Sequence, residues 1–192
     1  KSVEEQTKAQ SELFKIAQQT RLGFKETADL YSRIAISTKD YNLSQEKILG
    51  ITNTINKAMI ISGGTAESMN AAIMQLGQAF SGNFQSVGQE LASIREQTPA
   101  LYQAIVEGSG MTSQAFKKAA EDGELSAEII IKALEKQKEK IDSDFTKISK
   151  TVGQSMTLMS NSMLQFVGEV DKSTGASNSL ANSITSISLN ID

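Results

Sequence analysis

The stretch that decides the fold is residues 75–134, QLGQAFSGNFQSVGQELASIREQTPALYQAIVEGSGMTSQAFKKAAEDGELSAEIIIKAL. Its apolar residues recur three or four positions apart, which is the spacing of one face of an α-helix. Glycines interrupt this spacing repeatedly, and Pro99, the one proline in the chain, stands where a helix can begin. The pattern predicts a module of short capped helices and helical hairpins, flanked by longer helices, and therefore an all-α fold.

Polar residues that favour helix starts precede most of the predicted helices. A Ser or Thr hydroxyl at such a position can accept a hydrogen bond from a free backbone N–H group. Ser86 and Gln89 have the spacing of a capping box, and Thr98 before Pro99 is predicted to be an N-cap followed by proline at the first helical position. The predicted starts are Ser44, Thr65, Ser86, Thr98, Thr112 or Ser113, and Ser126, and the predicted stops are residues 63–64, Gly82, residues 108–110 and residues 122–123.

The composition excludes several classes of protein. The chain has no cysteine and no histidine, so it lacks disulfides, thiolate chemistry and the side chain most used for proton transfer and zinc binding. Its formal net charge is −3, and its basic residues alternate with acids, as in residues 132–140, KALEKQKEK. A protein dedicated to binding nucleic acid normally has a surface on which basic residues cluster without acidic ones. We therefore expect no cofactor and no specific nucleic-acid partner.

Three acidic residues near one turn, Glu121, Asp122 and Glu124, come closest to a hydrolytic site. Such catalysis needs one carboxyl group with a raised pKa in an apolar cleft, whereas side chains in a turn are normally solvated. Residues 142–144, Asp-Ser-Asp, begin like a calcium loop, but Gly153 stands where the bidentate glutamate should be. We therefore expect no catalytic residue, no metal site and no enzymatic activity.

Changes in pattern divide the chain into four segments. Residues 1–64 are predicted to be N-terminal helices that pack on a compact helical module at residues 65–140. Residues 141–172 are predicted to be a long heptad-patterned helix or helix pair, with a break offered at residues 151–153. In the last segment, residues 173–192, Ser, Thr and Asn predominate, and we expect a polar, mobile helical continuation.

The third segment carries a seam of apolar residues at near-heptad spacing. A helix with a single narrow apolar stripe needs a partner that covers the stripe, and two possible partners remain open. In the first, the seam packs on the chain's own Leu13, Ala17 and Phe24, and in the second it packs on another copy of itself. The seam consists of Ile141, Phe145, Ile148, Val152, Met156, Met159, Met163, Phe166 and Val170, and a later run with the spacing 4, 3, 4 consists of Leu180, Ile184, Ile187 and Ile191.

The order and spacing of these residues resemble the N-terminal module of tailed-phage tail tape measure proteins. The resemblance runs from near Thr65 to Ser177, with mild departures at Gly77 and Phe84. It implies structural positions, and no catalytic residue is carried over. The residues that carry it are Gln75, Leu76, Gly82, Glu90, Leu91, Ile94, Pro99, Leu101, Ile105, Gly110, Gly123 and Leu134.

The resemblance implies a structural function. Tape measure proteins are long helical rods around which the tail tube polymerises with the help of tail assembly chaperones, and the length of the rod limits the length of the tail. The implied location is the virion tail, assembled in the bacterial cytoplasm and encoded by a phage or prophage. The alternative is a helical module of a bacterial secreted or pore-forming protein, with residues 156–163 facing lipid. However, no apolar stretch approaches the roughly 20 residues of a membrane span. Because the chain begins at Lys1, we expect it to be a piece of a longer protein.

Overall fold

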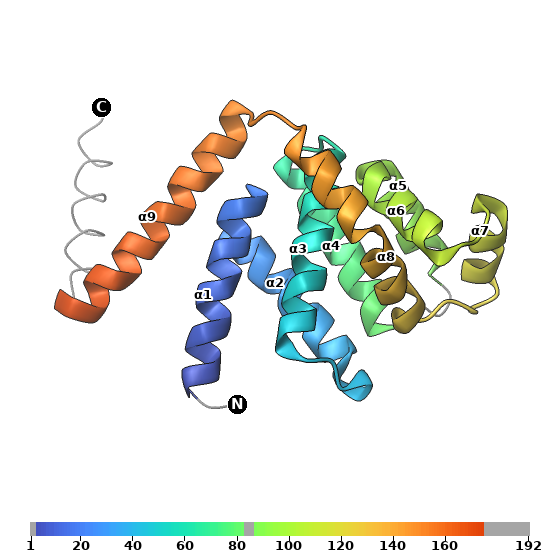
Figure 1. Ribbon diagram of the computed structural model, residues 1–192, viewed down its shortest axis with the longest axis horizontal. Coiled ribbons are helices and arrows are strands. Elements are labelled where there is room, and N and C mark those ends of the chain that lie inside the picture. The colour runs from blue at the N-terminus through green and yellow to red at the C-terminus, as the bar shows by residue number, and fades with distance from the viewer. Residues whose placement is uncertain (1–2, 83–86, 175–192) are drawn as a thin grey trace, which may run out of the picture.

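The computed structural model of the chain describes residues 3–82 and 87–174. This part of the chain contains nine α-helices, one 3₁₀ helix and no strand, which confirms the predicted all-α class. The helices are α1 (Val3–Thr20), α2 (Phe24–Ser37), η1 (Lys39–Tyr41), α3 (Gln45–Ile61), α4 (Ala66–Ser81), α5 (Gly88–Gln97), α6 (Pro99–Ser109), α7 (Ser113–Glu121), α8 (Ala127–Thr146) and α9 (Val152–Thr174). Figure 1 shows that α9 lies at the edge of the molecule, where it contacts α1.

Four helices begin at the residues that the sequence predicts. Each of the four cap side chains accepts a hydrogen bond from the backbone N–H group three residues later, at 3.2–3.3 Å. The predicted capping box begins at Ser86, which lies outside the described residues. The four confirmed caps are Ser44 for α3, Thr65 for α4, Thr112 for α7 and Ser126 for α8.

The start of α6 differs from the prediction in one respect. Pro99 is its first residue, as predicted, but the Thr98 hydroxyl does not cap it and instead donates to the carbonyl oxygen of Ile94 at 3.0 Å. The reason is that Thr98 also ends α5, where a carbonyl group is close to its hydroxyl. The N–H group of Ala100 donates instead to the hydroxyl of Ser62, which follows α3, at 3.1 Å. A residue that directly follows another helix therefore supplies the cap.

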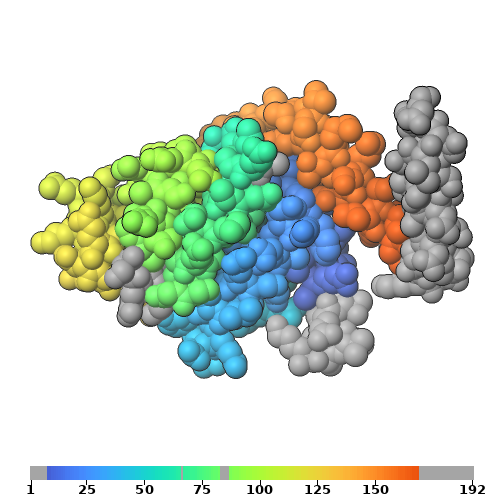
Figure 2. All heavy atoms as spheres, turned by 180° about the vertical axis from the view of Figure 1, so that it is seen from behind, coloured from blue at the N-terminus to red at the C-terminus, as the bar shows by residue number. Residues whose placement is uncertain are grey.

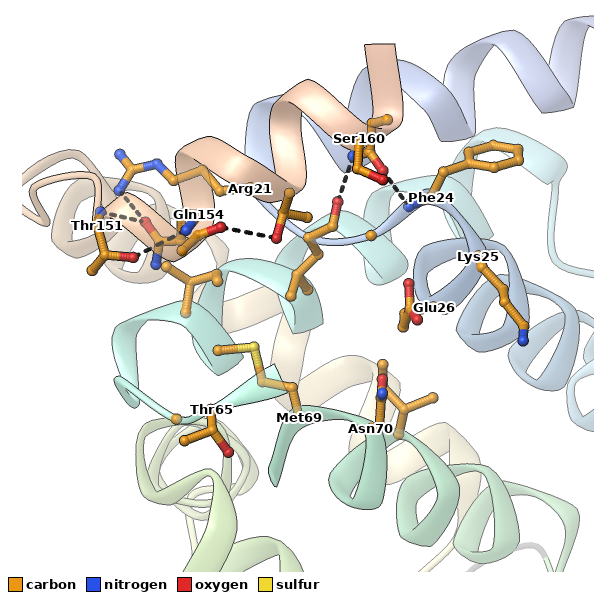
Figure 3. A pocket seen from close by; sticks show the side chains of 18 of the residues that line it. Arg21, Phe24, Lys25, Glu26, Thr65, Met69, Asn70, Thr151, Gln154 and Ser160 are labelled. Carbon is orange, nitrogen blue, oxygen red and sulfur yellow. Dashed lines mark hydrogen bonds between the residues drawn. The ribbon is translucent and has the colours of Figure 1, made fainter. Parts of the chain in front are cut away.

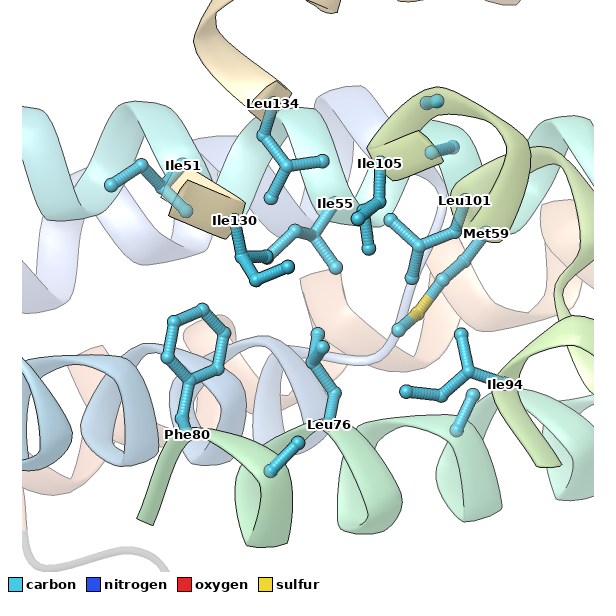
Figure 4. Packing of buried hydrophobic residues seen from close by; sticks show 14 of the residues in the cluster. Ile51, Ile55, Met59, Leu76, Phe80, Ile94, Leu101, Ile105, Ile130 and Leu134 are labelled. Carbon is cyan, nitrogen blue, oxygen red and sulfur yellow. The ribbon is translucent and has the colours of Figure 1, made fainter. Parts of the chain in front are cut away.

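One apolar core joins helices α1 to α8. Figure 4 shows its centre, where side chains of α3, α4, α5, α6 and α8 meet. Six residues of the proposed family motif belong to this core: Leu76, Leu91, Ile94, Leu101, Ile105 and Leu134. The core includes residues on both sides of positions 64 and 140, and the domain boundaries predicted there stay predictions.

A glycine allows α6 and α8 to pack closely. A Cβ atom added at Gly108 would overlap the carbonyl oxygen of Ala133 and would lie 2.6 Å from its carbonyl carbon and 2.8 Å from its Cα atom. All three atoms belong to the backbone of α8, which cannot rotate away as a side chain can. Gly108 therefore fixes the distance at which these two helices meet.

A buried polar cluster ties the first three helices together. The side-chain amide of Asn56, in α3, donates to the hydroxyl of Thr20 at 3.2 Å and to the hydroxyl of Thr27 at 3.0 Å. All three side chains are fully buried. Because Thr20 ends α1 and Thr27 lies in the first turns of α2, Asn56 holds both sides of the turn between these helices.

Seen from behind in Figure 2, α9 lies at one end of the molecule and α7 at the other. The turn between α1 and α2 lies close to α9, and the contacts between them form the candidate site.

Candidate interaction site

The last helix begins with a capping box that the sequence analysis did not identify. The hydroxyl of Thr151 accepts from the N–H group of Gln154 at 3.1 Å, and the side-chain oxygen of Gln154 accepts from the N–H group of Thr151 at 3.3 Å. This reciprocal pair starts a new helix at Val152. The break between α8 and α9 lies at residues 147–151, slightly before the predicted residues 151–153, and it allows α9 to leave the direction of α8.

A buried asparagine attaches α9 to the turn between α1 and α2. The side-chain oxygen of Asn161 accepts from the N–H group of Phe24 at 2.9 Å, and its side-chain amide donates to the carbonyl oxygen of Leu22 at 2.8 Å. Only 2% of Asn161 is exposed. Gly23 is the N-cap of α2 and has no side chain to offer, so Asn161 takes the place of the missing cap.

Arg21 provides the second attachment. Its φ of 63° is in the left-handed region, which is unfavourable for a residue with a side chain. Its guanidinium group donates to the carbonyl oxygen of Ile148 at 2.9 Å and to the side-chain oxygen of Gln154 at 3.4 Å. The same group lies 4.6 Å from the centre of the Phe145 ring, within the range of a cation–π interaction. One side chain of the turn therefore binds the end of α8, the linker and the start of α9.

A cavity of about 600 Å³ lies between α9 and the turns that join α1 to α2 and α3 to α4. Figure 3 shows Arg21 and Gln154 on one side of it and Met69 and Asn70 on the other. Its lining mixes apolar and polar side chains, and Arg21 is already hydrogen-bonded. Beside this cavity, the hydrogen bonds of Asn161 and Arg21 attach α9 to the body.

The predicted seam divides into a buried part and an exposed part. Ile141 and Phe145 are buried in the core, and Ile148 packs against it. Beyond the linker, five residues are 54–82% exposed, and we call them the apolar stripe: Val152, Met156, Met159, Met163 and Phe166. The side chain of Val170 lies outside the described part of the chain.

Packing of the whole seam on Leu13, Ala17 and Phe24 was the first interpretation, and it is wrong for the apolar stripe. Residues two apart on a helix differ by about 200° in direction, so Asn161 and Met163 point to opposite sides of α9. The face that carries Asn161 turns toward the body because its hydrogen bonds attach it there. The apolar stripe therefore faces solvent.

The surface of α9 is also free of charge over most of its length. No charged residue occurs from Thr151 to Gly168, although Lys150 and Glu169 flank this segment. Scattered exposed apolar residues are ordinary, but a continuous exposed stripe marks a surface that binds something. Because this segment carries no charge, salt bridges cannot determine which partner it binds.

The polar and glycine residues of the proposed family motif occupy helix ends and partly buried helix positions. Gly82 and Gly110 end α4 and α6, Gly123 follows α7 with a φ of 71°, and Glu90 lies in the first turn of α5. Gln75 is half-buried in α4. These are structural places, whereas the role of the residues as a family motif stays a prediction.

The acidic residues considered for catalysis lie in solvent. Glu121, Asp122 and Glu124 are exposed around the end of α7, and Glu121 forms an ion pair with Lys117 at 3.7 Å. The residues considered for calcium are already paired: Asp142 binds Lys57 and Lys138 at 2.7 and 2.8 Å. Burial raises the pKa of the Asp142 carboxyl, but the hydrogen bonds from the two lysines outweigh this effect and hold the pKa below its ordinary value.

A family model described as "Tape measure protein" matches residues 1–172. No curated protein and no solved structure matches the chain. The matched range includes α1 to α8 and nearly all of α9.

Proposed function

Since the chain belongs to the tape measure protein family, whose members are structural components of phage tails, we propose that it is the assembly module of a protein that templates the tail tube and fixes tail length. The observation that carries this proposal is the match over residues 1–172. The matched range covers the residues of the folded body and most of those of the exposed helix.

The two parts of the module suit two different tasks. The body, α1 to α8, has one continuous apolar core and suits a fixed handle for the tail tube and tail assembly chaperone proteins. The last helix lies apart from the body and has a heptad-spaced face turned outward, which suits the beginning of a rod. Such a module would act in the virion tail after assembly in the host cytoplasm, whether its gene belongs to a phage or a prophage.

Self-association through the seam is a second proposal for the apolar stripe. The exposure of Met156, Met159 and Met163 supports it, because a stripe of this kind packs on a similar stripe. The absence of charge from Thr151 to Gly168 supports it too, since two copies of this segment would not repel each other.

The family match favours a tail protein over the pore-forming alternative. Among the described residues, no helix has both the length and the apolar character that crossing a membrane would require.

The assembly role can be tested in the phage or prophage that encodes the chain. Deleting residues 1–150 from the parent protein should abolish tails or leave their length uncontrolled, because the proposed handle would be gone. Electron microscopy of negatively stained lysates measures the number and length of the tails. Tails of ordinary number that are shortened in proportion to the deletion would show that the module is part of the ruler and not a handle. Tails of unchanged number and length would contradict the assembly role.

We also propose that the module has no hydrolytic activity. The exposure of Glu121 and Glu124 supports this, since a catalytic carboxyl group needs an apolar cleft to raise its pKa. The purified chain should release no soluble fragments from peptidoglycan above a buffer control. Release that persists on repeated purification and disappears in the Glu121→Gln or Glu124→Gln variant would contradict the proposal.

A further inference from the structure

Four residues of the apolar stripe are arranged symmetrically along α9. Met156 and Met159 stand five and two residues before Asn161, and Met163 and Phe166 stand two and five residues after it. At about 100° per residue, these four side chains lie within about 80° of one another, and Asn161 points to the opposite side of the helix. All four are 54–61% exposed. The face that the body leaves uncovered therefore reads the same in both directions along the helix.

Symmetry of this kind suits a pair of identical helices. An interface between two copies related by a two-fold axis must be complementary to itself, so that residue i contacts residue j and residue j contacts residue i. In an antiparallel pair centred on position 161, Met156 of each copy lies opposite Phe166 of the other, and Met159 lies opposite Met163. We propose that two copies of the chain associate through such an antiparallel pair of α9 helices.

The proposal rests on the self-association proposed above, and it adds the direction and register of the two helices. The residues that carry it belong to α9 (Val152–Thr174). The polar continuation predicted for residues 173–192 lies, beyond Thr174, outside the described part of the chain, so the proposal depends on α9 alone.

The types of the four side chains favour the antiparallel direction. In the antiparallel pair, each Phe166 ring lies against the thioether of Met156, and contacts between sulfur and aromatic rings are favourable. A parallel pair would instead set Phe166 against Phe166 and each methionine against itself, with the bulkiest side chains at one end. Parallel two-stranded coiled coils favour β-branched residues that alternate with leucine, and none of the four residues is of either kind.

The flanks of the stripe and the position of α9 leave room for a second copy. Charged residues beside an apolar seam normally determine the partner and its direction, whereas Ser155 and Ser160 flank this one. Asn161 attaches the opposite face of α9 to the body, and α9 lies at one end of the molecule (Figure 2). A second helix can therefore approach the stripe from the side away from the body.

Engineered cysteines can test the direction, because the natural chain has none. Met156→Cys and Phe166→Cys are made as separate variants of the 192-residue chain, one of them with an affinity tag that changes its mass. In the antiparallel pair, equal residues at these positions lie about 15 Å apart along the helices, so thiols meet only between the two variants. A standard interface has about 20–30 residues a side, so this smaller one should be weak and is tested at about 100 µM chain.

Under mild oxidation, the mixed disulfide between Met156→Cys and Phe166→Cys should form at least about 10-fold faster than a disulfide between two copies of either variant. Non-reducing electrophoresis separates the mixed dimer from the two others by mass. If Met156→Cys links to itself as fast as it links to Phe166→Cys, the copies associate but the antiparallel register is overturned. Circular dichroism shows that each variant keeps its helices.

The variant Met74→Cys is the matched control for random collisions. Met74 lies in α4 and is 52% exposed, close to the 57% of Met156. A mixed disulfide that forms no faster than the Met74→Cys dimer would overturn self-association itself. Sedimentation equilibrium of the natural chain checks this without any substitution, and a chain that is still monomeric at about 1 mM would overturn the proposal as well. Neither result bears on the assembly role, which is tested by tail number and length.

Discussion

Replacing Gly108 with alanine should destabilise the chain by about 3 kcal/mol, although alanine is normally the better helix former. The added methyl group would overlap the carbonyl oxygen of Ala133, so α6 and α8 would have to move apart. Their separation would loosen the core, because α8 also packs on α3. Urea unfolding followed by circular dichroism measures the change in the free energy of unfolding.

A second glycine provides a matched control. Gly50 lies inside α3, more than one turn from either end, and a Cβ atom added there would have no neighbour within 4 Å. Gly50→Ala should therefore stabilise the chain by about 0.5–1 kcal/mol, since alanine loses less backbone freedom on folding. If both variants stabilised the chain by similar amounts, the close approach of α6 to α8 would be wrong.

Local features of this fold could be predicted because they depend on neighbours in the sequence. A cap such as Ser44 or Thr65 binds an N–H group three residues away, so its partner stands in the same short stretch. The burial of Leu76 and Ile105 follows from the helical spacing of apolar residues in the same way. Thr98 shows the limit, because its hydroxyl had two local partners and the sequence does not say which one it takes.

The attachment of α9 could not be predicted, because its partners are far apart in the sequence. Asn161 and Phe24 are separated by 137 residues, and an asparagine in a polar helix gives no sign that it is buried. Heptad spacing indicates which residues share a face but not whether that face turns inward. The one local signal was Gly23, which leaves the start of α2 without a cap side chain and so requires a donor or acceptor from elsewhere.

Replacing Asn161 with leucine should loosen the attachment of α9 to the body. Leucine is similar in size, but it would leave the N–H group of Phe24 and the carbonyl oxygen of Leu22 without their partners. A buried backbone group without a partner costs about 1–3 kcal/mol. The hydrogen bonds of Arg21 and Gln18 to this part of the chain would stay in place. Undocking by about 2 kcal/mol corresponds to about 30-fold faster amide exchange, and hydrogen exchange with mass spectrometry should detect it in residues 153–168 and at the start of α2.

The variant Ser155→Leu places the same side chain on an exposed position of the same helix. The Ser155 hydroxyl donates to the carbonyl oxygen of Thr151 one turn earlier, and this bond does not attach α9 to the body. Exchange in residues 153–168 should therefore stay close to that of the natural chain. Equal exchange in the two variants would show that Asn161 does not hold α9, whereas faster exchange in Asn161→Leu alone, with α3 and α6 still protected, would show that Asn161 helps to hold the exposed helix on the folded body.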